Sequence, residues 1–507
     1  MFDVLAMYLP QFHRTKENDL WWGEGFTEWT TVKGAKPLFD GHLQPEVPLN
    51  ENYYDLLDKE TMRWQIDLMK KYGVDGICIY HYWFKDGRKI LEKPAENLLN
   101  WNDLDTKYCF CWANETWIRT WNNGIDGNVW AARYENGSSF DNNGILLEQQ
   151  YGNSDAWKKH FDYLLHFFKD ERYIKRNNKP VFVIYRPKLI FCLEDMMELW
   201  NSLAKQNEFD GVYFIFANCS YRKDNLADLA DLVLVHEPRY TILYSAAKTI
   251  DSDKIYRIYN YDEIVNKSLK FVSRKSNVSY GGFVGYDETP RRGRKGIAIA
   301  NRTSEQFREY MKHLFAKNEA AGSPYVFINA WNEWGEGMHL EPDEFYREDN
   351  LQALYDAKKN YGALVPEYKE LLKNPTVIYN DKERDKYEIY TQALHNWLLK
   401  KELGRSFSEY LKSFGIRSVA VYGVGILGKH FISELKGSDV QIKYTIDQAE
   451  DVRANADLPV YKKDQIMELN VDVIVVTVIY DYESIKNELK KYTRAKIMSL
   501  EQIIMEC

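Results

Sequence analysis

Short, continuous apolar runs separated by longer segments with helical spacing dominate the first 360 residues. Between the runs, apolar residues recur every three to four positions, which predicts helices over 56–73, 156–169, 193–206, 305–320 and 350–359. Apolar residues fill each run without alternation, as is typical of a parallel strand covered on both faces. We therefore predict eight such strands, over 4–8, 76–80, 108–112, 181–185, 212–217, 232–235, 281–285 and 325–330.

Eight strand–helix units in one stretch of chain predict an α/β fold, a (β/α)8 TIM barrel with insertions. A doubly wound open sheet is the alternative, although it usually has fewer strands and a site near one switch point. We assign 1–365 to the barrel as catalytic domain and 366–415, which is charged and helical in spacing, to a helical linker. A strand, a glycine turn and a helix then open a small Rossmann-like α/β module over 416–507.

Composition narrows the class of protein. A chain of 507 residues is too long for one ordinary hydrophobic core, which indicates more than one domain. Its content of 45% hydrophobic and 28% charged residues is typical of a globular protein. The net charge of −8 disfavours nucleic acid as a partner. There is no membrane-length apolar stretch and no secretion signal at the N-terminus, and the six cysteines lack zinc-type spacing. We expect a reduced, cytoplasmic protein without a membrane span.

Aromatic residues are unusually frequent, at 15%, and every tryptophan except Trp397 precedes residue 366. Flat rings suit stacking on sugars, although they also fill cores. Active sites of (β/α)8 barrels lie at the carboxyl ends of the strands, and here polar and aromatic residues gather after the strands. The predicted substrate-binding residues are Tyr8, Gln11, His13, His81, Tyr82, Trp83, Trp112, Asn114, Glu115, Trp117, Tyr185, Arg186, Asn218, His236, Glu237, Tyr286, Asp287, Trp331, Asn332, Trp334 and His339.

Two glutamates three residues apart, Glu333 and Glu336, follow the last strand in "INAWNEWGEGMHLEP". Cleaving or forming a glycosidic bond needs a proton donor and a second group on the other side, and two carboxylates supply both. Burial by tryptophans and mutual repulsion would keep one of them protonated near neutral pH. The alternative is that the pair caps a helix or binds arginines. On this basis we predict Glu333 and Glu336 as the catalytic pair.

Other chemistries have weaker signals. A metal could use His81, His236, Glu237, Glu333 and His339, but no HExxH or HxH spacing supports it, so no metal is predicted. A GxSxG nucleophile elbow is absent. The basic turn 287–296, "DETPRRGRKG", is either a phosphate site or a solvated loop.

The last module carries a glycine turn that opens a helix, Gly423-x-Gly425-x-x-Gly428, with Asp447 at the end of the next strand. This is the pattern of a dinucleotide fingerprint. The module has only about half the length of a full dinucleotide-binding domain, so a structural role is equally open. Catalysis is expected to need no cofactor.

Six motifs together resemble the WbsX-type glycosyltransferase family, whose barrel is similar to the glycoside hydrolase family 99 domain. They are "MYLPQFH", "WWGEGFTEWT", "YHYWF", "WANETW", "YDETPRR" and "NAWNEWGEGMHLEP", and the resemblance covers roughly 1–360. It implies a role in bacterial O-antigen and capsule assembly. The related hydrolases are retaining endo-α-mannosidases, with an NEWxE-type motif. By this resemblance Glu333 would deprotonate or polarise the sugar 2-hydroxyl and Glu336 would be the general acid/base.

The expected function is thus a carbohydrate-active enzyme, a glycosyltransferase of bacterial surface polysaccharide, including the O-antigen of lipopolysaccharide. Its expected partners are an oligosaccharide or glycan substrate, nucleotide-sugar or lipid-linked, and other polysaccharide-biosynthesis proteins. Two alternatives stay open. One is a retaining endo-α-mannosidase-like hydrolase or transglycosylase, and the other is a non-catalytic sugar-binding scaffold.

Overall fold

A nearly closed ring of parallel strands, with helices around it, makes up the larger part of the protein. The computed structural model describes residues 2–118, 128–129, 145–217, 225–245, 247–250, 256–273, 275–376, 382–447 and 458–507. In ring order the strands are β1 (Asp3–Tyr8), β2 (Gly76–His81), β3 (Lys107–Trp112), β8 (Lys179–Ile184), β9 (Tyr213–Ala217), β10 (Leu232–Val235), the pair β12 (Val278–Tyr280) and β13 (Gly282–Phe283), and β15 (Tyr325–Asn329).

The ring closes through the seventh strand position, which is divided at Gly281. β12 pairs with β10, while β13 pairs with β15, which in turn pairs with β1. The Gly281 N–H donates to the carbonyl of Val235 at 3.0 Å, and a Cβ at Gly281 would lie 2.5 Å from that oxygen. Only glycine allows this close crossing. All eight predicted strands are present, so the TIM-barrel prediction is confirmed and the open sheet is wrong.

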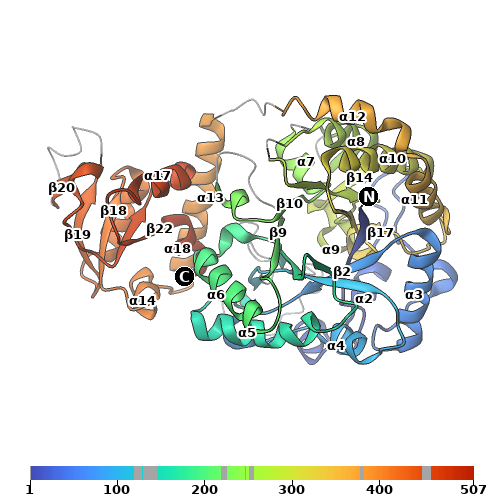
Figure 1. Ribbon diagram of the computed structural model, residues 1–507, viewed down its shortest axis with the longest axis horizontal. Coiled ribbons are helices and arrows are strands. Elements are labelled where there is room, and N and C mark those ends of the chain that lie inside the picture. The colour runs from blue at the N-terminus through green and yellow to red at the C-terminus, as the bar shows by residue number, and fades with distance from the viewer. Residues whose placement is uncertain are drawn as a thin grey trace.

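Helices surround the ring and bury its outer face (Figure 1). Their apolar stripes explain the predicted spacing: α3, for example, buries Met62, Ile66 and Met69 against the strands. The five predicted helices are confirmed within a few residues. The covering helices are α3 (Lys59–Tyr72), α4 (Lys93–Asn100), α5 (Ser154–Phe168), α6 (Leu193–Gln206), α8 (Tyr261–Lys270), α10 (Ser304–Ala321) and α11 (Asp349–Asn360).

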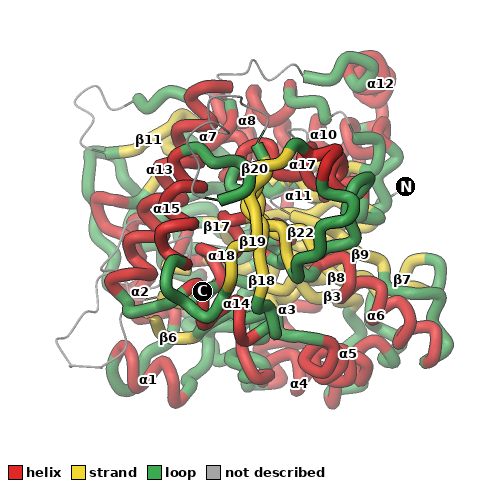
Figure 2. Tube along the Cα trace, turned by 90° about the vertical axis from the view of Figure 1, so that its left-hand side faces the viewer, coloured by secondary structure: helices red, strands yellow, loops and turns green. Residues whose placement is uncertain are grey.

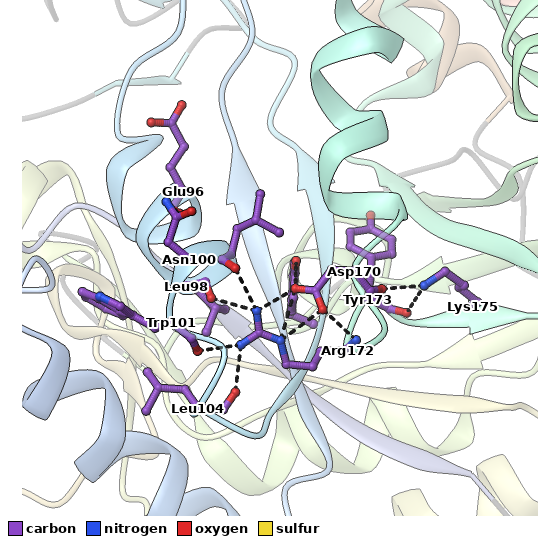
Figure 3. A network of polar contacts seen from close by, with 11 residues as sticks. Glu96, Leu98, Asn100, Trp101, Leu104, Asp170, Arg172, Tyr173 and Lys175 are labelled. Atoms are coloured by element: carbon purple, nitrogen blue, oxygen red, sulfur yellow. Dashed lines mark hydrogen bonds and ion pairs between the residues drawn. The ribbon is translucent and has the colours of Figure 1, made fainter. Parts of the chain in front are cut away.

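The amino-terminal side of the barrel is built for stability, as a network around Arg172 shows (Figure 3). Its guanidinium donates to the carbonyls of Leu98 and Leu104 at 2.9 Å, and thereby satisfies acceptors at and just beyond the end of α4. Asp170 holds the guanidinium at 2.7 Å and also accepts from Tyr108 on β3 at 2.9 Å. The network ties α4 to the start of β3, far from the carboxyl ends of the strands.

At the carboxyl ends, short elements that the apolar pattern did not predict make up the mouth of the barrel. They are α1 (Lys16–Trp22), α2 (Glu28–Lys33), α7 (Arg239–Tyr244), α9 (Thr289–Arg292), and the hairpin β16 (Asn332–Glu333) and β17 (Met338–His339) around the 3-10 turn η6 (Trp334–Glu336). Further small elements are β4 (Trp117–Ile118), β5 (Asn128–Val129), β6 (Ile145–Leu147), β7 (Lys175–Arg176), β11 (Arg257–Asn260), β14 (Ile297–Ala300) and α12 (Val365–Leu371).

A second, five-stranded parallel sheet follows near the C-terminus. Its order is β20 (Val460–Tyr461), β19 (Gln441–Ile446), β18 (Ser418–Tyr422), β21 (Val473–Val476) and β22 (Lys496–Ser499). Val419 and Val421 of β18 face one core with α15 (Ile426–Leu435) and α18 (Leu500–Glu506), and Ala420 faces another with α17 (Tyr482–Leu489). The alternation places helices on both faces of the sheet (Figure 2).

The helices α13 (Lys382–Glu402) and α14 (Phe407–Ser413) lie in the segment predicted as a linker, and both pack into the core of the C-terminal sheet. This sheet lies beside the barrel on the side of α6 (Figure 1). The rings of Phe191 and Phe414 meet edge-on with centroids 5.1 Å apart, and Lys486 pairs with Glu194 at 3.0 Å. The two parts therefore share a direct interface. The domain boundaries at 365 and 415 stay a prediction.

Candidate active site

One buried arginine joins three carboxylates at the mouth of the barrel. The Nε of Arg291, on α9, lies 2.8 Å from Glu28 on α2. Its Nη2 lies 3.0 Å from Glu333 and its Nη1 lies 2.5 Å from Glu336. The side chains of Glu28 and Glu333 are 0% and 8% exposed, whereas that of Glu336 is 28% exposed. The two predicted glutamates thus share one cation, and Glu336 is the one that solvent reaches.

The hairpin after β15 holds this pair in place. The side chain of Asn332 accepts from the Leu9 N–H at 2.7 Å and donates to the Leu9 carbonyl at 3.0 Å, which ties the hairpin to the end of the first strand. The backbone N–H of Asp287 donates to the carbonyl of Glu336 at 2.6 Å. Segments from three strand ends therefore fix the positions of both carboxylates.

Burial controls the protonation of this cluster. It raises the pKa of Glu333 to about 8; Arg291 opposes the shift, and the charges of Glu336 and Glu28 add to it. Burial also raises the pKa of Glu28, against the effect of Arg291. At neutral pH Glu333 is therefore largely protonated, although it lies next to an arginine.

Gly335 lies between the two glutamates in sequence and lets the backbone there approach Glu28 and Arg291 closely. A Cβ at this position would lie 1.9 Å from Oε1 of Glu28 and 2.7 Å from Nε of Arg291. The neighbouring Gly337 has a left-handed φ of 59°. The hairpin sequence thus uses small residues where the arginine and its carboxylates come closest to the backbone.

We expect Gly335→Ala to lower activity by more than tenfold, because the new methyl group would displace Glu28 and Arg291 and thereby move Glu333 and Glu336, the predicted catalytic pair. Gly362→Ala is the matched control, since a Cβ there has no neighbour within 4 Å. Initial rates of both variants, together with their unfolding temperatures, check the prediction. Equal activity of the two variants would contradict it.

Several predicted aromatic residues lie within electrostatic reach of the pair. The charge of Glu333 acts on Tyr82, and that of Glu336 acts on Tyr185 and Tyr286, all three of which burial gives a raised pKa. Trp117 packs edge-on against Tyr82 with ring centroids 5.1 Å apart. The charges of the two glutamates therefore act on rings at three strand ends, and Trp117 packs against one of these rings.

A second cluster of buried side chains, formed by Trp334, His339 and Glu341, supports the hairpin. The indole N–H of Trp334 donates to Glu341 at 2.6 Å, and its ring stacks on His339 with centroids 3.7 Å apart. Burial lowers the pKa of His339, but Glu46 and Asp343 outweigh it and raise the pKa overall. The carboxylate of Asp287 binds the side chains of two residues of the first loop, each at 2.7 Å, namely His42 and Gln44.

The structure places other predicted residues away from the pair, in packing positions. Tyr8 points to α3 and donates to Gln65 at 2.7 Å. His81 lies 2.8 Å from His160 of α5, and burial lowers its pKa to about 3. Two further residues of the β2 and β3 ends join this aromatic cluster: Trp83 stacks on His160, and Trp112 donates its indole N–H to the Trp83 carbonyl at 3.1 Å.

Polar residues after β3, β8 and β10 mostly connect backbone segments. Asn114 accepts from the Arg186 N–H at 2.8 Å, and Glu115 pairs with the Arg186 side chain at 2.7 Å. Glu237 caps α7 by accepting from Thr241, at 3.0 Å from the backbone N–H and 2.7 Å from the hydroxyl. Glu237 is thus a structural carboxylate, and Glu115 and Arg186 form an ion pair at the mouth.

The first strand end contributes buried polar groups. The carbonyl of Gln11 accepts from the N–H of Glu28 at 3.3 Å, and its side-chain amide has no hydrogen-bond partner among the described residues. His13 is buried, which lowers its pKa. Trp331 is fully buried, and its backbone N–H donates to the Met7 carbonyl at 2.8 Å. Asn218 lies outside the residues that the structure describes.

Four residues of the barrel mouth were not predicted from the sequence, namely Glu28, Tyr80, Arg239 and Arg291. Arg291 lies in the basic turn that the sequence indicated as a phosphate site or a solvated loop. It is instead 7% exposed and bound to carboxylates. Glu28 belongs to a quoted motif, but its pattern offers no reason to expect burial. Both became recognisable only as partners of the pair.

The glycine turn of the C-terminal sheet has the geometry of a tight strand-to-helix connection. Gly423 has a φ of 88°, Gly425 caps α15, and a Cβ at Gly428 would lie 2.0 Å from the Gly423 carbonyl. Asp447 accepts from the N–H of Val424 at 2.8 Å. These contacts explain the glycines and the aspartate by packing. A nucleotide at this turn stays a prediction.

Among the described residues, no cluster of three or more His, Cys, Asp or Glu side chains is suited to holding a metal ion. Within the same ranges, every helix is too short or too polar to span a bilayer.

The fold and the site define the class: this is a (β/α)8 barrel protein with a glutamate pair, held by one buried arginine, at the mouth of its barrel. The chain belongs to the family described as Glycosyltransferase WbsX, whose model matches residues 4–354. The resemblance seen in the motifs is therefore confirmed.

Individual proteins are also similar to this chain. The protein WxcX of Xanthomonas campestris pv. campestris (strain B100), described as uncharacterised, is 30% identical over 349 residues, which cover 67% of this chain and 47% of WxcX. The chain thus spans about half the length of the curated relatives it matches. A GH99 endo-α-mannosidase structure from Bacteroides thetaiotaomicron aligns with 15% identity and a TM-score of 0.43, over 73% of this chain and 98% of that one.

Proposed function

We propose that the protein is a glycosyltransferase of bacterial surface polysaccharide, such as O-antigen or capsule, and that Glu333 and Glu336 carry the reaction. The observation that supports this most is the pair itself, held by one buried arginine at the barrel mouth with only Glu336 partly open to solvent. Family membership adds support for a carbohydrate substrate.

The two carboxylates differ in environment and therefore in role. Glu336, the more exposed, moves the proton at the reacting oxygen: it takes the proton from an acceptor hydroxyl in transfer, or gives one to the bridging oxygen in hydrolysis. Glu333, buried and with a raised pKa, polarises or deprotonates the sugar 2-hydroxyl next to the reacting carbon. Arg291 keeps both carboxylates in position and does not take part in proton transfer.

The experiment is a mass-spectrometric screen of the purified protein with acceptor oligosaccharides, with and without nucleotide sugars or lipid-linked sugars. The proposal expects products one sugar longer that appear only when an activated donor is present. Shortened mannose-type oligosaccharides without any donor would overturn the transferase assignment. They would support the alternative, an endo-α-mannosidase-like hydrolase or transglycosylase, which the two-carboxylate chemistry also serves.

The pH dependence of kcat/KM tests the role of Glu333. Its ionised form is the base, and its pKa is about 8, so kcat/KM should rise with pH and level off above about pH 8. Glu28→Gln removes a neighbouring negative charge and leaves Arg291 freer to stabilise ionised Glu333. The rising limb should therefore move to lower pH in this variant. A limb that stays in place, or moves to higher pH, would contradict this role.

A further inference from the structure

Both carboxylate oxygens of Asp287 accept hydrogen bonds from within the chain, and its side chain is 12% exposed. Oδ2 accepts from Nε2 of His42 and from Nε2 of Gln44, each at 2.7 Å. Oδ1 accepts from the backbone N–H of Thr289, the first residue of α9, at 2.8 Å. The side chain therefore joins the first loop, residues 34–48, to the start of α9.

Asp287 reaches Glu336 by two routes. Its backbone N–H donates to the carbonyl of Glu336 at 2.6 Å, and its Cβ would lie 3.0 Å from a Cβ at the neighbouring Gly337. The helix that its Oδ1 holds carries Arg291, whose Nη1 lies 2.5 Å from the carboxylate of Glu336. The position of the Glu336 backbone and the position of its carboxylate therefore both depend on Asp287.

The first loop holds Asp287 through a histidine whose ring is fixed at both nitrogens. Nδ1 of His42 accepts from the backbone N–H of Leu38 at 3.0 Å, so the ring proton lies on Nε2, which faces Asp287. The ring also stacks on Phe39, with centroids 4.1 Å apart and planes inclined by 8°. His42 therefore makes two separable kinds of contact, hydrogen bonds that reach Asp287 and a stacked ring inside its own loop.

The same loop binds the hairpin at a second place. Glu46 lies 3.4 Å from Nδ1 of His339 on β17, and the two side chains are 20% and 2% exposed. The backbone N–H of Glu344, which follows the hairpin, donates to the carbonyl of Val47 at 2.9 Å. The loop is thus attached to the hairpin at β17 as well as, through Asp287, at η6.

We propose that Asp287 is a positioning residue for Glu336, and that the first loop holds it in place through His42 and Gln44. This inference rests on the proposed function, in which Glu336 moves the proton at the reacting oxygen. In this role Asp287 itself transfers no proton. Disturbing a positioning residue lowers kcat and leaves KM nearly unchanged, because the substrate still binds while the acid–base group is displaced from the reacting atoms.

Two substitutions at His42 separate its hydrogen bonds from its packing. Glutamine keeps a donor for Asp287 and an acceptor for Leu38 but loses the ring that stacks on Phe39, whereas phenylalanine keeps a ring and loses both hydrogen bonds. On the substrate found in the screen, we expect His42→Phe to lower kcat about tenfold or more with little change in KM. His42→Gln should retain most of the wild-type kcat. A ring that matters only for packing gives the opposite order.

Asp287→Asn tests the carboxylate itself. The asparagine oxygen can still accept from Thr289, but its amide N–H groups would face the donors of the first loop. We therefore expect kcat to fall at least as far as in His42→Phe. His313→Phe is the matched control, because His313 lies on α10, outside the mouth, with its Nδ1 3.0 Å from the hydroxyl of Tyr368. Its kcat should equal that of wild type.

Hydrogen exchange measured by mass spectrometry without substrate gives a second readout. The amide of Asp287, which donates to Glu336, should exchange about tenfold faster in His42→Phe than in wild type, His42→Gln or His313→Phe. Four results would each overturn the inference: a kcat of His42→Phe equal to or above that of His42→Gln, wild-type activity of Asp287→Asn, an effect confined to KM, or unchanged exchange at Asp287 in His42→Phe. Because the exchange readout needs no turnover, the positioning role and the proposed reaction can fail separately.

Discussion

Glu336→Gln is expected to lower the turnover number at least a hundredfold while the protein stays folded. Glutamine keeps the size of the side chain and an acceptor for Arg291, but it cannot give or take a proton, and general acid–base groups contribute about 10²–10⁴ in rate. The side chain is 28% exposed, so the change leaves no deeply buried polar group without a partner. Steady-state rates on the substrate found in the screen measure the effect.

Glu305→Gln is the control for this variant, because Glu305 also pairs with an arginine but lies on the outer face of α10, 62% exposed. Its activity should equal that of wild type. The scaffold alternative makes the opposite prediction for Glu336, namely full function of the glutamine variant in cells. Retained activity in purified Glu336→Gln would therefore contradict the proposed role of Glu336 in proton transfer.

Arg291→Met is expected to destabilise the barrel by about 3–5 kcal/mol, the range for removing one partner of a buried ion pair. Three carboxylates would then lie together without their shared cation, two of them almost fully buried. The pKa values of Glu28 and Glu333, already raised by burial in the folded state, would rise further without the opposing charge of Arg291. A group whose pKa is raised on folding stabilises the folded protein below its unfolded pKa, and this stabilisation is lost as the pH rises through its folded pKa. The loss of unfolding free energy in Arg291→Met, relative to wild type, should therefore be small in mild acid and grow toward pH 8.

Urea unfolding followed by tryptophan fluorescence measures this loss in the barrel, because every tryptophan except Trp397 precedes residue 366. Arg308→Met is the surface control and should change stability by no more than about 0.5 kcal/mol. The double variant Arg291→Met with Glu28→Gln should recover part of the loss, since one uncompensated charge is gone. A loss that does not depend on pH would show that the arginine acts through packing alone.

The sequence by itself predicted the barrel because its strands are buried on both faces and leave continuous apolar runs. The eight runs and the five helices were each found within a few residues. The position of Glu333 and Glu336 together at the barrel mouth was also predictable, since they are close in sequence and follow a strand end. The glycine between them belongs to the same local pattern. Such features depend on neighbours a few residues apart, which a linear pattern records.

What only the tertiary structure decided is which partner each polar residue meets. Arg291 is 263 residues from Glu28, and nothing local distinguishes it from Arg292. Tyr8, His81 and Asn114 stand at strand ends as active-site residues do, yet their side chains turn to α3, to α5 and to a neighbouring loop. Sequence gives the end of a strand, but the face on which a side chain emerges there depends on how the ring closes and which helix packs against it.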